Sequence, residues 1–515
     1  MKNNVGLFVA KRAVLQPNQD AIVDIASGER LTYGELDARC NRLANGLVDA
    51  GLRSGDRVAT LLMNGSEFVE IFFGTAKAGG VIVPLNWRLV ADELSFILTD
   101  SGAETLIFGT AFAEVVADLH ARGDAGTKIE RWIHVGDEAD RPEFARGYEE
   151  VLAAVSADEP KLGASDDDLL FIMYTSGTTG LPKGVMHSHN TTMWSSLTAL
   201  VTADIRWDDR YLICLPLFHV GALNPLLSSI HRGGTIVIMA EFDPLRIWEI
   251  YGEEKISVTL AVPAMLNFML ATYDAGVHDI SNLRWIMSGA APVPVSLIEK
   301  YAGMGIEINQ VYGLTESGGP ACLISPAEAL ERAGSTGKAF YHTDVKVVDP
   351  EGNEVGPNET GEVLVRGPHI MVGYWNRPDA TAETLVDGWL HSGDIAMIDA
   401  DGYLYIQDRI KDMIISGGEN VYPAEIENTL ATHEGIKDVA VIGMDSAKWG
   451  ESPLAIVVKQ DEALSAEDVL AFCKGKLAPF KLPRGVEFVD EIPRNPTGKV
   501  LKRVLREQFP GPAPS

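Results

Sequence analysis

The chain of 515 residues contains only four cysteines and no long apolar run. The cysteines form no CxxC pair and no cysteine and histidine ligand spacing, so we expect neither a disulfide framework nor a zinc site. No segment offers about 18 uninterrupted apolar residues, the length that a membrane-spanning helix needs. The apolar stretch at residues 5–10 is short and is closed by Lys11 and Arg12, which does not fit a signal peptide. These absences favour a reducing compartment, and we expect a cytoplasmic protein without an integral membrane segment.

Positive charge is scarce as well. The 43 lysines and arginines are outnumbered by 72 aspartates and glutamates, which gives a formal net charge of −29. Such a balance disfavours polyanionic partners, because a nucleic acid or an anionic membrane surface would be repelled. We therefore expect no nucleic-acid partner, and the acidity itself carries no information about the fold.

Apolar residues, in contrast, are abundant and regularly spaced. They make up 46% of the chain, enough for large buried cores, and the length suggests about three units of about 150 residues. Thr32 and Glu35 form a predicted capping box before a helix, and residues 58–63 and 81–84 have the pattern of buried strands. Helical patterns alternate with such β-branched runs along most of the chain. This alternation predicts a layered α/β fold.

Glycines and charged residues concentrate between residues 394 and 419, which we interpret as a domain boundary. After this segment, a helical pattern at 426–430 is followed by strand patterns at 439–443 and 454–459 and by a helix that starts at Ser465. About a hundred residues of mixed helix and strand pattern are enough for a small separate domain.

The strongest chemical signal is the loop YTSGTTGLPKG at residues 174–184, which follows a strand pattern. Its glycines allow backbone N–H groups to approach a polyphosphate, its hydroxyls add donors, and Lys183 supplies a positive charge. A Walker-type P-loop ends in Gly-Lys followed by Ser or Thr, whereas here Gly177 is followed at that offset by Pro182 and Lys183. The loop therefore predicts a nucleotide site of a different type.

This loop resembles the signature of the adenylate-forming superfamily, which contains acyl-CoA synthetases, adenylation domains and luciferases. Seven further segments resemble motifs of that family and follow one another in its order. They are LPLFH at 215–219, SGAAP at 288–292, QVYGLTE at 310–316, SGD at 392–394, DRIK at 408–411, GGEN at 417–420 and PTGK at 496–499. The similarity extends over nearly the whole chain, and it looks closest to bacterial fatty-acid-CoA ligases.

The resemblance implies an α/β protein of two unequal domains. Residues 1–410 would form a large layered N-terminal domain with two α/β subdomains and a β-rich subdomain, and this domain would hold the ATP and acid sites. Residues 411–515 would form a small mobile α+β domain that carries the adenylation lysine and one side of the CoA channel. Lys411 stands at the family's hinge position, where a charged residue can stay solvated while the backbone rotates. A homodimer is compatible with this resemblance.

The resemblance also assigns a nucleotide site. Tyr312 resembles the aromatic residue that stacks on adenine, Asp394 the carboxylate that binds the ribose hydroxyls, and Arg409 a second ribose contact. Glu316 and Thr175 are the expected ligands of Mg²⁺, a hard ion that takes oxygen ligands beside substrate phosphates. The expected ATP or AMP contacts are Thr175, Ser176, Gly177, Thr178, Thr179, Gly180, Lys183, Gly289, Ala290, Ala291, Gln310, Tyr312, Gly313, Thr315, Asp394 and Arg409.

Four residues are expected to take part in catalysis, namely Lys499, Glu316, Thr175 and His219. Lys499 resembles the adenylation lysine, which would bridge the attacking carboxylate and the α-phosphate and neutralise charge as pyrophosphate leaves. His219 stands where related ligases carry an aromatic gate to the thiol path, and we do not assign it as a general base. Beyond Lys499, the helical spacing of Lys502, Arg503 and Arg506 predicts a solvated basic face.

The acid pocket and the CoA channel are expected nearby. The expected pocket residues are His219, Val220, Gly221, Asn224, Gly289, Gly313 and Gly318, and the expected channel residues are Gly417, Gly418 and Glu419. The pocket segment after His219 holds no Asp to receive a substrate ammonium, so amino acids are disfavoured, and the glycines favour a deep apolar slot.

The resemblance therefore implies an AMP-forming acid–CoA ligase that uses ATP, Mg²⁺ and coenzyme A as co-substrate. A medium- or long-chain fatty acid is the expected substrate, and an aryl acid such as a cinnamate or benzoate is the main alternative. A ligase that loads an acyl carrier protein is a third hypothesis. No carrier domain is visible after Lys499, so the carrier would be a separate protein.

Overall fold

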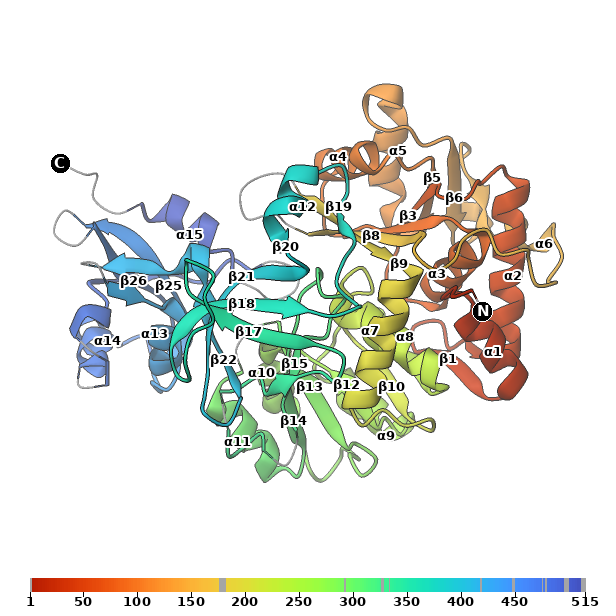
Figure 1. Cartoon of the computed structure of the whole chain (residues 1–515). Coiled ribbons are helices and arrows are strands. Elements are labelled where there is room, and N and C mark those ends of the chain that lie inside the picture. The colour runs from red at the N-terminus through yellow and green to blue at the C-terminus, as the bar shows by residue number, and fades with distance from the viewer. Residues whose placement is uncertain are drawn as a thin grey trace.

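The computed structural model describes residues 2–175, 182–290, 293–325, 328–332, 334–416, 419–446, 450–474, 476–477, 479–494 and 500–510. It consists of a large body built from the first four-fifths of the chain and a smaller body at the C-terminal end (Figure 1). Three sheets belong to the large body and one to the small body. The prediction of an α/β fold with a large N-terminal and a small C-terminal domain is confirmed.

An eight-stranded sheet with the order β19-β9-β8-β4-β3-β5-β6-β7 forms the first layer. Its strands are β3 (Arg57–Leu61), β4 (Val81–Pro84), β5 (Thr105–Gly109), β6 (Arg131–Val135), β7 (Arg146–Gly147), β8 (Leu169–Thr175), β9 (Lys183–Ser188) and β19 (Gly373–Tyr374). The helices in this part of the chain are α2 (Tyr33–Asp49), α3 (Ser66–Ala78), α4 (Ala91–Ser101), α5 (Ala113–Ala121) and α6 (Tyr148–Ala153), with 3-10 turns at Thr110–Phe112, Gly123–Ala125 and Glu138–Asp140. Every residue of β4 is buried, because helices cover both faces of a parallel sheet.

The predicted capping box starts α2. The Thr32 hydroxyl accepts from the Glu35 backbone N–H, and the Glu35 carboxylate accepts from the Thr32 N–H over 2.9 Å. The apolar stripe that follows, including Leu36, Leu43 and Leu47, is buried in the main core cluster. This helix therefore forms as its sequence predicts.

A nine-stranded sheet with the order β16-β15-β14-β13-β12-β10-β11-β1-β2 forms the second layer. Its strands are β1 (Asp20–Asp24), β2 (Arg30–Thr32), β10 (Arg210–Ile213), β11 (Thr235–Ile238), β12 (Val258–Leu260), β13 (Trp285–Ser288), β14 (Glu307–Tyr312), β15 (Cys322–Leu323) and β16 (Lys338–Ala339). The helices are α1 (Leu7–Leu15), α7 (His189–Thr202), α8 (Val220–Arg232), α9 (Arg246–Glu253), α10 (Pro263–Thr272) and α11 (Val295–Gly303). Strands β12, β13 and β14 run parallel, so their carboxyl ends meet at one edge, where α/β proteins bind ligands.

A five-stranded antiparallel sheet completes the large body. It contains β17 (Asp344–Val348), β18 (Thr360–Arg366), β20 (Leu385–Val386), β21 (Trp389–Ile398) and β22 (Leu404–Arg409), and α12 (Pro378–Thr384) lies beside it. This sheet corresponds to the expected β-rich subdomain.

The small body begins after the 3-10 turn η4 (Ile410–Asp412). It contains β23 (Ile414–Ser416), β24 (Glu419–Val421), α13 (Pro423–Leu430), β25 (Ile436–Ser446), β26 (Gly450–Lys459), α14 (Ala466–Cys473), the turn η5 (Pro479–Lys481), β27 (Gly485–Phe488) and α15 (Lys502–Gln508). Its sheet has two hydrophobic clusters of its own, made only of residues after 413. A division at residue 410 stays a prediction, and the separate cores support it.

The prediction of a solvated basic face on α15 is wrong for Lys502 and holds only in part for Arg506, which is partly exposed. Lys502 has a side chain only 11% exposed, and its Nζ lies 3.0 Å from a carboxylate oxygen of Glu427. Arg506 donates to Asp412 in the turn η4 over 2.9 Å. Only Arg503 is exposed, and it pairs with Glu507 one turn along the helix. Helical spacing defined the face correctly, but acidic groups elsewhere in the chain cover that face.

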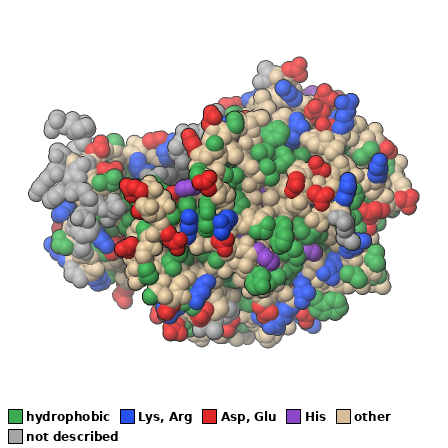
Figure 2. Space-filling model, in the orientation of Figure 1, with side chains coloured by type: hydrophobic (Ala, Val, Ile, Leu, Met, Phe, Trp, Pro, Cys, Tyr) green, Lys and Arg blue, Asp and Glu red, His purple; other side chains and the backbone are tan. Residues whose placement is uncertain are grey.

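Among the described residues, no helix combines the length and the apolar character that crossing a membrane requires. On the face drawn in Figure 2, acidic and basic side chains are interspersed over the large body.

Candidate active site

The described nucleotide residues meet where β14 and β22 end, beside the middle of β21. Tyr312 is the last residue of β14, and its hydroxyl donates to Oδ2 of Asp394 over 2.7 Å. Arg409 lies opposite Asp394 in the pairing of β21 with β22, and its Nε is 2.9 Å from Oδ1 of that carboxylate. Burial, with Asp394 as a further cause, raises the pKa of the Tyr312 hydroxyl well above its usual value. The structure therefore brings together the three residues expected around the adenosine.

At two positions beside this cluster, Gly289 and Gly313, the backbone leaves no room for a side chain. A Cβ at Gly289 would stand 2.4 Å from the carbonyl oxygen of Val311, and a Cβ at Gly313 would stand 1.5 Å from the carbonyl oxygen of Gly319. Ala290 has a φ of 66°, a left-handed conformation that non-glycine residues rarely adopt. Close backbone packing and a strained residue at the ends of two neighbouring parallel strands are typical of a ligand-binding edge.

The phosphate side of the site is described at both ends of its loop. Thr175 and Lys183 are paired partners in the β8 and β9 ladder, so the loop leaves and re-enters the sheet at one point. Lys183 Nζ lies 5.0 Å from the centre of the Tyr374 ring, and the Tyr374 hydroxyl donates to Oε1 of Glu316 over 2.9 Å. Tyr374 thus links the loop lysine to the expected metal ligand, and our sequence reasoning missed it. The Gly-Tyr-Trp run at 373–375 was the only signal.

Glu316 fits a Mg²⁺ ion that is held mainly by phosphates. No group of three or more acidic, histidine or cysteine side chains that could hold a metal occurs in the part of the chain that the structure describes. Mg²⁺ commonly takes one or two protein oxygens and completes its shell with phosphate oxygens and water. One Glu316 oxygen accepts from Tyr374, and the carboxylate lies close enough to Arg409 for their charges to interact. These contacts orient the carboxylate and connect the expected metal ligand to the residues expected around the adenosine.

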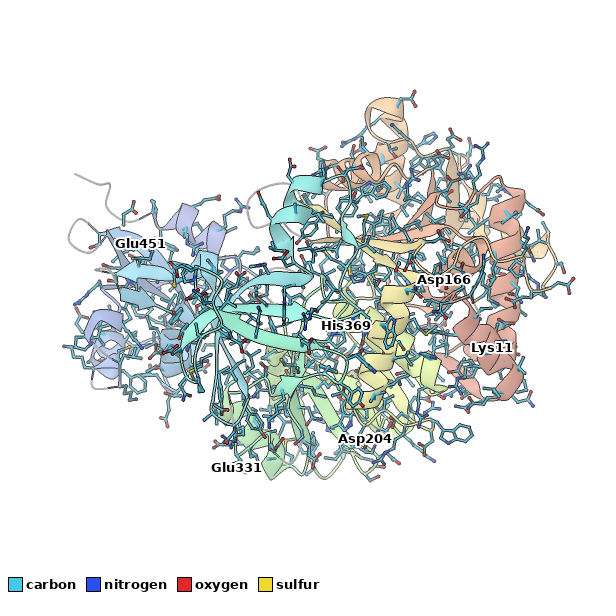
Figure 3. The ribbon with its side chains drawn as sticks, in the orientation of Figure 1. Lys11, Asp166, Asp204, Glu331, His369 and Glu451 are labelled. Atoms are coloured by element: carbon cyan, nitrogen blue, oxygen red, sulfur yellow. The ribbon has the colours of Figure 1, made fainter. Side chains whose placement is uncertain are left out.

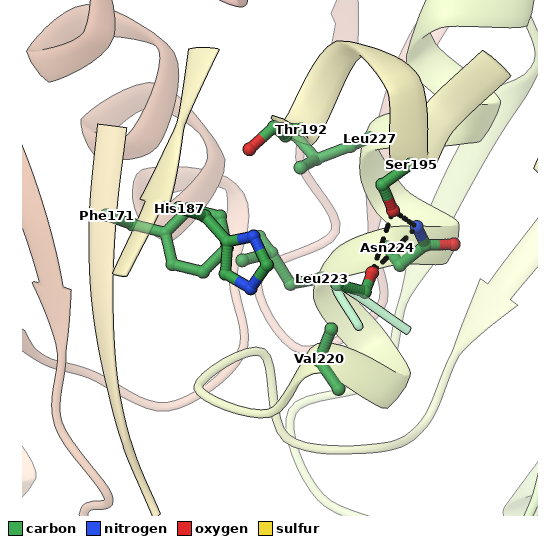
Figure 4. Close-up of a pocket in the computed structure, with 9 residues that line it drawn as sticks. Phe171, His187, Thr192, Ser195, Val220, Leu223, Asn224 and Leu227 are labelled. Atoms are coloured by element: carbon green, nitrogen blue, oxygen red, sulfur yellow. Dashed lines mark hydrogen bonds between the residues drawn. The ribbon is translucent and has the colours of Figure 1, made fainter. Parts of the chain in front are cut away.

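A narrow cavity lies beside this cluster, between α7, α8 and the strands β8 and β9 (Figure 4). Three expected pocket residues, Val220, Asn224 and Gly318, line it together. The other four, His219, Gly221, Gly289 and Gly313, are not among its lining. The other lining residues are Phe171, His187, Thr192, Ser195, Leu223 and Leu227. Its free volume of about 10 Å³ leaves room for about one water molecule. An acid would have to enlarge this cavity in order to bind.

One wall of the cavity is polar. Asn224 donates to the Ser195 hydroxyl over 2.6 Å and to the Gly318 carbonyl over 3.2 Å, and Ser195 donates to the same carbonyl over 2.8 Å. The rest of the lining is mainly apolar, and a deep apolar slot for the acid stays a prediction. Asn224 was among the expected pocket residues, whereas Ser195 carried no sequence signal, because nothing in its place along the chain shows that it lies opposite Asn224.

His219 precedes α8 as its N-cap residue. Burial lowers its pKa from 6.5 to about 3, so its imidazole is neutral, and among the described residues its Nε2 has no hydrogen-bond partner. A neutral ring with a free nitrogen suits a steric gate better than a general base, which needs a pKa near the working pH.

Several expected site residues are not placed. Lys499, Ser176, Gly177, Thr178, Thr179, Gly180, Ala291, Gly417 and Gly418 lie outside the described residues. The backbone of Lys411 lies in η4, and that of Glu419 begins β24. Gln310 turns its side-chain amide to the Ser335 carbonyl over 2.9 Å, where it is buried. Thr315 lies in the loop after β14, next to Glu316.

Family comparison agrees with this geometry. The family model described as AMP-binding enzyme matches residues 9–375, and the model described as AMP-binding enzyme C-terminal domain matches residues 425–499. The chain belongs to the AMP-binding enzyme family. The two matched segments of this family fall in the large and the small body, and the recognition as an adenylate-forming enzyme is confirmed.

Relatives of this AMP-binding enzyme match along the full length. It is 43% identical over 511 residues to long-chain-fatty-acid–CoA ligase FadD13 of Mycobacterium tuberculosis, with 99% of each chain covered. It is 40% identical to feruloyl-CoA synthase of an Amycolatopsis species, covering 99% of this chain and 100% of that one. A solved Mycobacterium tuberculosis fatty acyl CoA synthetase is 43% identical, covers 98% of both chains and superposes with a TM-score of 0.80.

Proposed function

We propose that this enzyme is an AMP-forming fatty-acid–CoA ligase that uses ATP, Mg²⁺ and coenzyme A. The observation that carries the proposal is the continuous polar cluster from Tyr312, Asp394 and Arg409 to Glu316 and Tyr374, which lies beside the cavity. It offers an adenosine side, a phosphate and metal side, and an adjacent acid site. The full-length similarity to a long-chain-fatty-acid–CoA ligase supports the acid and the thiol.

In the first half-reaction, an oxygen of the carboxylic acid would attack the α-phosphorus of ATP, and pyrophosphate would leave. Asp394 and Arg409 would hold the ribose, while Thr175 and Lys183 would bind the phosphates at the mouth of the loop. When bound by Glu316 and Thr175, Mg²⁺ would neutralise charge on the phosphates. In the second half-reaction, the CoA thiol would attack the acyl carbon and release AMP, with His219 bordering the thiol path.

We propose that the enzyme works in a reducing compartment such as the cytoplasm. All four cysteines are free and buried, and burial raises the thiol pKa of Cys40, Cys214, Cys322 and Cys473. Unpaired buried thiols are typical of proteins that are kept reduced.

The polar wall of the cavity favours an aryl acid as the second candidate substrate. Asn224 and Ser195 would leave polar atoms beside an aliphatic tail, whereas a hydroxyl or methoxy group on an aromatic ring could hydrogen-bond to them. The 40% identity to a feruloyl-CoA synthase supports the same alternative.

A pyrophosphate-release assay over aliphatic and aromatic acids, with and without CoA, tests the proposal. We expect turnover that requires ATP, Mg²⁺ and a medium- or long-chain acid, and that forms acyl-CoA when CoA is added. Higher kcat/KM for hydroxylated aryl acids would select the second candidate. Acid-dependent pyrophosphate release that never responds to CoA would contradict a CoA ligase and indicate a carrier protein as acceptor.

Lys411→Pro is expected to slow thioester formation about tenfold more than adenylation, because proline fixes φ at the proposed hinge. Lys411→Ala is the matched control, since it removes the side chain but leaves the backbone free to rotate. Rapid-quench measurement of each half-reaction distinguishes the two steps. Equal rates of thioester formation in the proline and alanine variants would contradict a hinge at residue 411.

A further inference from the structure

His187 lies at the junction of the cavity and the proposed metal site. It is the fifth residue of β9, it is fully buried, and its ring packs on Phe171 with centroids 4.9 Å apart. Figure 4 shows the two rings side by side at one wall of the cavity. Both side chains line that cavity, so His187 lies where an acid would bind.

The two ring nitrogens of His187 have different partners. Nε2 lies 2.8 Å from the carbonyl oxygen of Thr315, which can only accept, so Nε2 carries the proton. Nδ1 lies 3.2 Å from the Thr191 hydroxyl and is the acceptor. Burial lowers the pKa of His187 from 6.5 to about 4, so the ring is neutral at ordinary pH. The tautomer is therefore set by the two neighbours.

The hydrogen bond to the Thr315 carbonyl is one of several that hold the loop at residues 315–318. Four consecutive carbonyls, those of residues 315–318, each accept a hydrogen bond from outside the loop. The donors are His187 Nε2 to Thr315, the Met371 N–H to Glu316, His369 Nδ1 to Ser317, and the Ser195 and Asn224 side chains to Gly318. This loop is held from the strand side by β9, from the helix side by α7 and α8, and from the segment at 369–371.

His369 and His187 differ in one respect. His369, labelled in Figure 3, lies between the antiparallel sheet of the large body and α7, and its Nε2 accepts from Thr343 over 2.8 Å. It holds the loop but does not line the cavity. His187 lines the cavity and also bonds the loop that carries Glu316. It therefore contacts the proposed acid site and this loop at the same time.

We propose that His187 is a positioning residue for adenylation, which holds the Thr315 carbonyl and thereby fixes Glu316 relative to the bound acid. Thr315 is an expected ATP contact and Glu316 an expected metal ligand, and the inference rests on the proposed function. The Thr315 carbonyl also accepts from the Gly318 N–H over 3.0 Å. Loss of His187 therefore leaves no unpaired buried carbonyl, and the variants should fold.

The test compares His187→Leu, which keeps the apolar volume, with His187→Gln, which restores a donor near the position of Nε2. His187→Leu is expected to lower kcat for acid-dependent ATP–pyrophosphate exchange about tenfold, the effect of one hydrogen bond in the transition state. It should also raise the Mg²⁺ concentration needed for half-maximal rate, and His187→Gln should recover both. His134→Leu is the matched control, because His134 also lies on a strand, packs on a phenylalanine and bonds a threonine hydroxyl, away from the cavity.

The competing role is that of a simple pocket wall. In that case both His187 variants would change the KM for the acid, while kcat and the Mg²⁺ dependence would stay at wild-type values, and this result would overturn the inference. Calorimetric titration with Mg²⁺ and ATP without any acid gives a second readout, in which His187→Leu should bind more weakly than wild type and His134→Leu. Equal binding would also overturn the inference. A wild-type enzyme that binds Mg²⁺ and ATP but activates no acid would instead refute the proposed function.

Discussion

Lys499→Ala is expected to lower acyl-adenylate formation by at least about 10²- to 10³-fold, the usual effect of removing a group that stabilises transition-state charge. The lysine would bridge the attacking carboxylate and the α-phosphate, two anionic groups that repel each other until a cation lies between them. Thioester formation from supplied acyl-adenylate should keep the wild-type rate, because in that step the small domain would have rotated and carried the lysine away. The expected result is therefore the loss of one half-reaction only.

The two half-reactions are measured separately, by ATP–pyrophosphate exchange and by acyl-CoA formation from synthetic acyl-adenylate. Lys437→Ala is a suitable control, because Lys437 is an exposed lysine of the same small body, on β25. It should match wild type in both assays. Equal loss of both half-reactions in Lys499→Ala would refute the assignment, since a lysine needed in both steps could not be the one that withdraws.

Mild acid is expected to unfold the large domain. Burial lowers the pKa of five of its histidines from 6.5 to about 3 or 4, namely His187, His189, His219, His231 and His369. Their pKa in the unfolded chain is the ordinary 6.5, so below about pH 6.5 the unfolded chain binds protons that the folded chain does not. The free energy of unfolding is thus undiminished above about pH 6.5 and falls as the pH decreases toward about 4.

The size of the effect follows from the number of groups. Each histidine lowers the free energy of unfolding by about 1.4 kcal/mol per pH unit within that range. Over two pH units the five together amount to the order of 10 kcal/mol, which is comparable to the whole stability of a typical domain. We expect the unfolding temperature to fall steeply between about pH 6.5 and about pH 5.

Differential scanning calorimetry across this pH range, with potentiometric counting of the protons taken up on unfolding, measures the effect. His231→Asn is the matched variant, because it keeps a polar atom near Nδ1, which bonds the Ser196 hydroxyl, and removes one titrating group. It should take up one proton fewer and show a shallower pH dependence. An unfolding temperature that does not change over this range would contradict the assignment of neutral buried histidines.

Local sequence patterns predicted much of this fold. The capping box at Thr32 and Glu35 and the strand at Val81–Pro84 formed as expected, because the relevant contacts lie within a few residues or involve a fully apolar run. The helix at Ser465 also begins where expected, with the Ser465 hydroxyl accepting from Asp468. Such signals need no knowledge of tertiary partners.

Two long-range contacts of the site were not predicted. Tyr374 meets Glu316 across 58 positions of sequence, and His187 meets Thr315 across 128. Lys502 was predicted to be solvated for the same reason, since the acidic groups that cover it come from α13 and from the end of β22. Residue type and spacing show which side chains share a face, but they do not show which other element packs on it.

The hydrogen bonds of Asp394 bear on the energetics of nucleotide capture. A carboxylate offers about four acceptor positions, and Tyr312 and Arg409 use one on each oxygen, which leaves capacity for ribose hydroxyls. Two partners therefore already orient the side chain, and little reorganisation free energy would remain to be spent on binding a ribose. Discrimination between ATP and its 2′-deoxy analogue would then depend on the lost hydrogen bond itself rather than on any rearrangement of the protein.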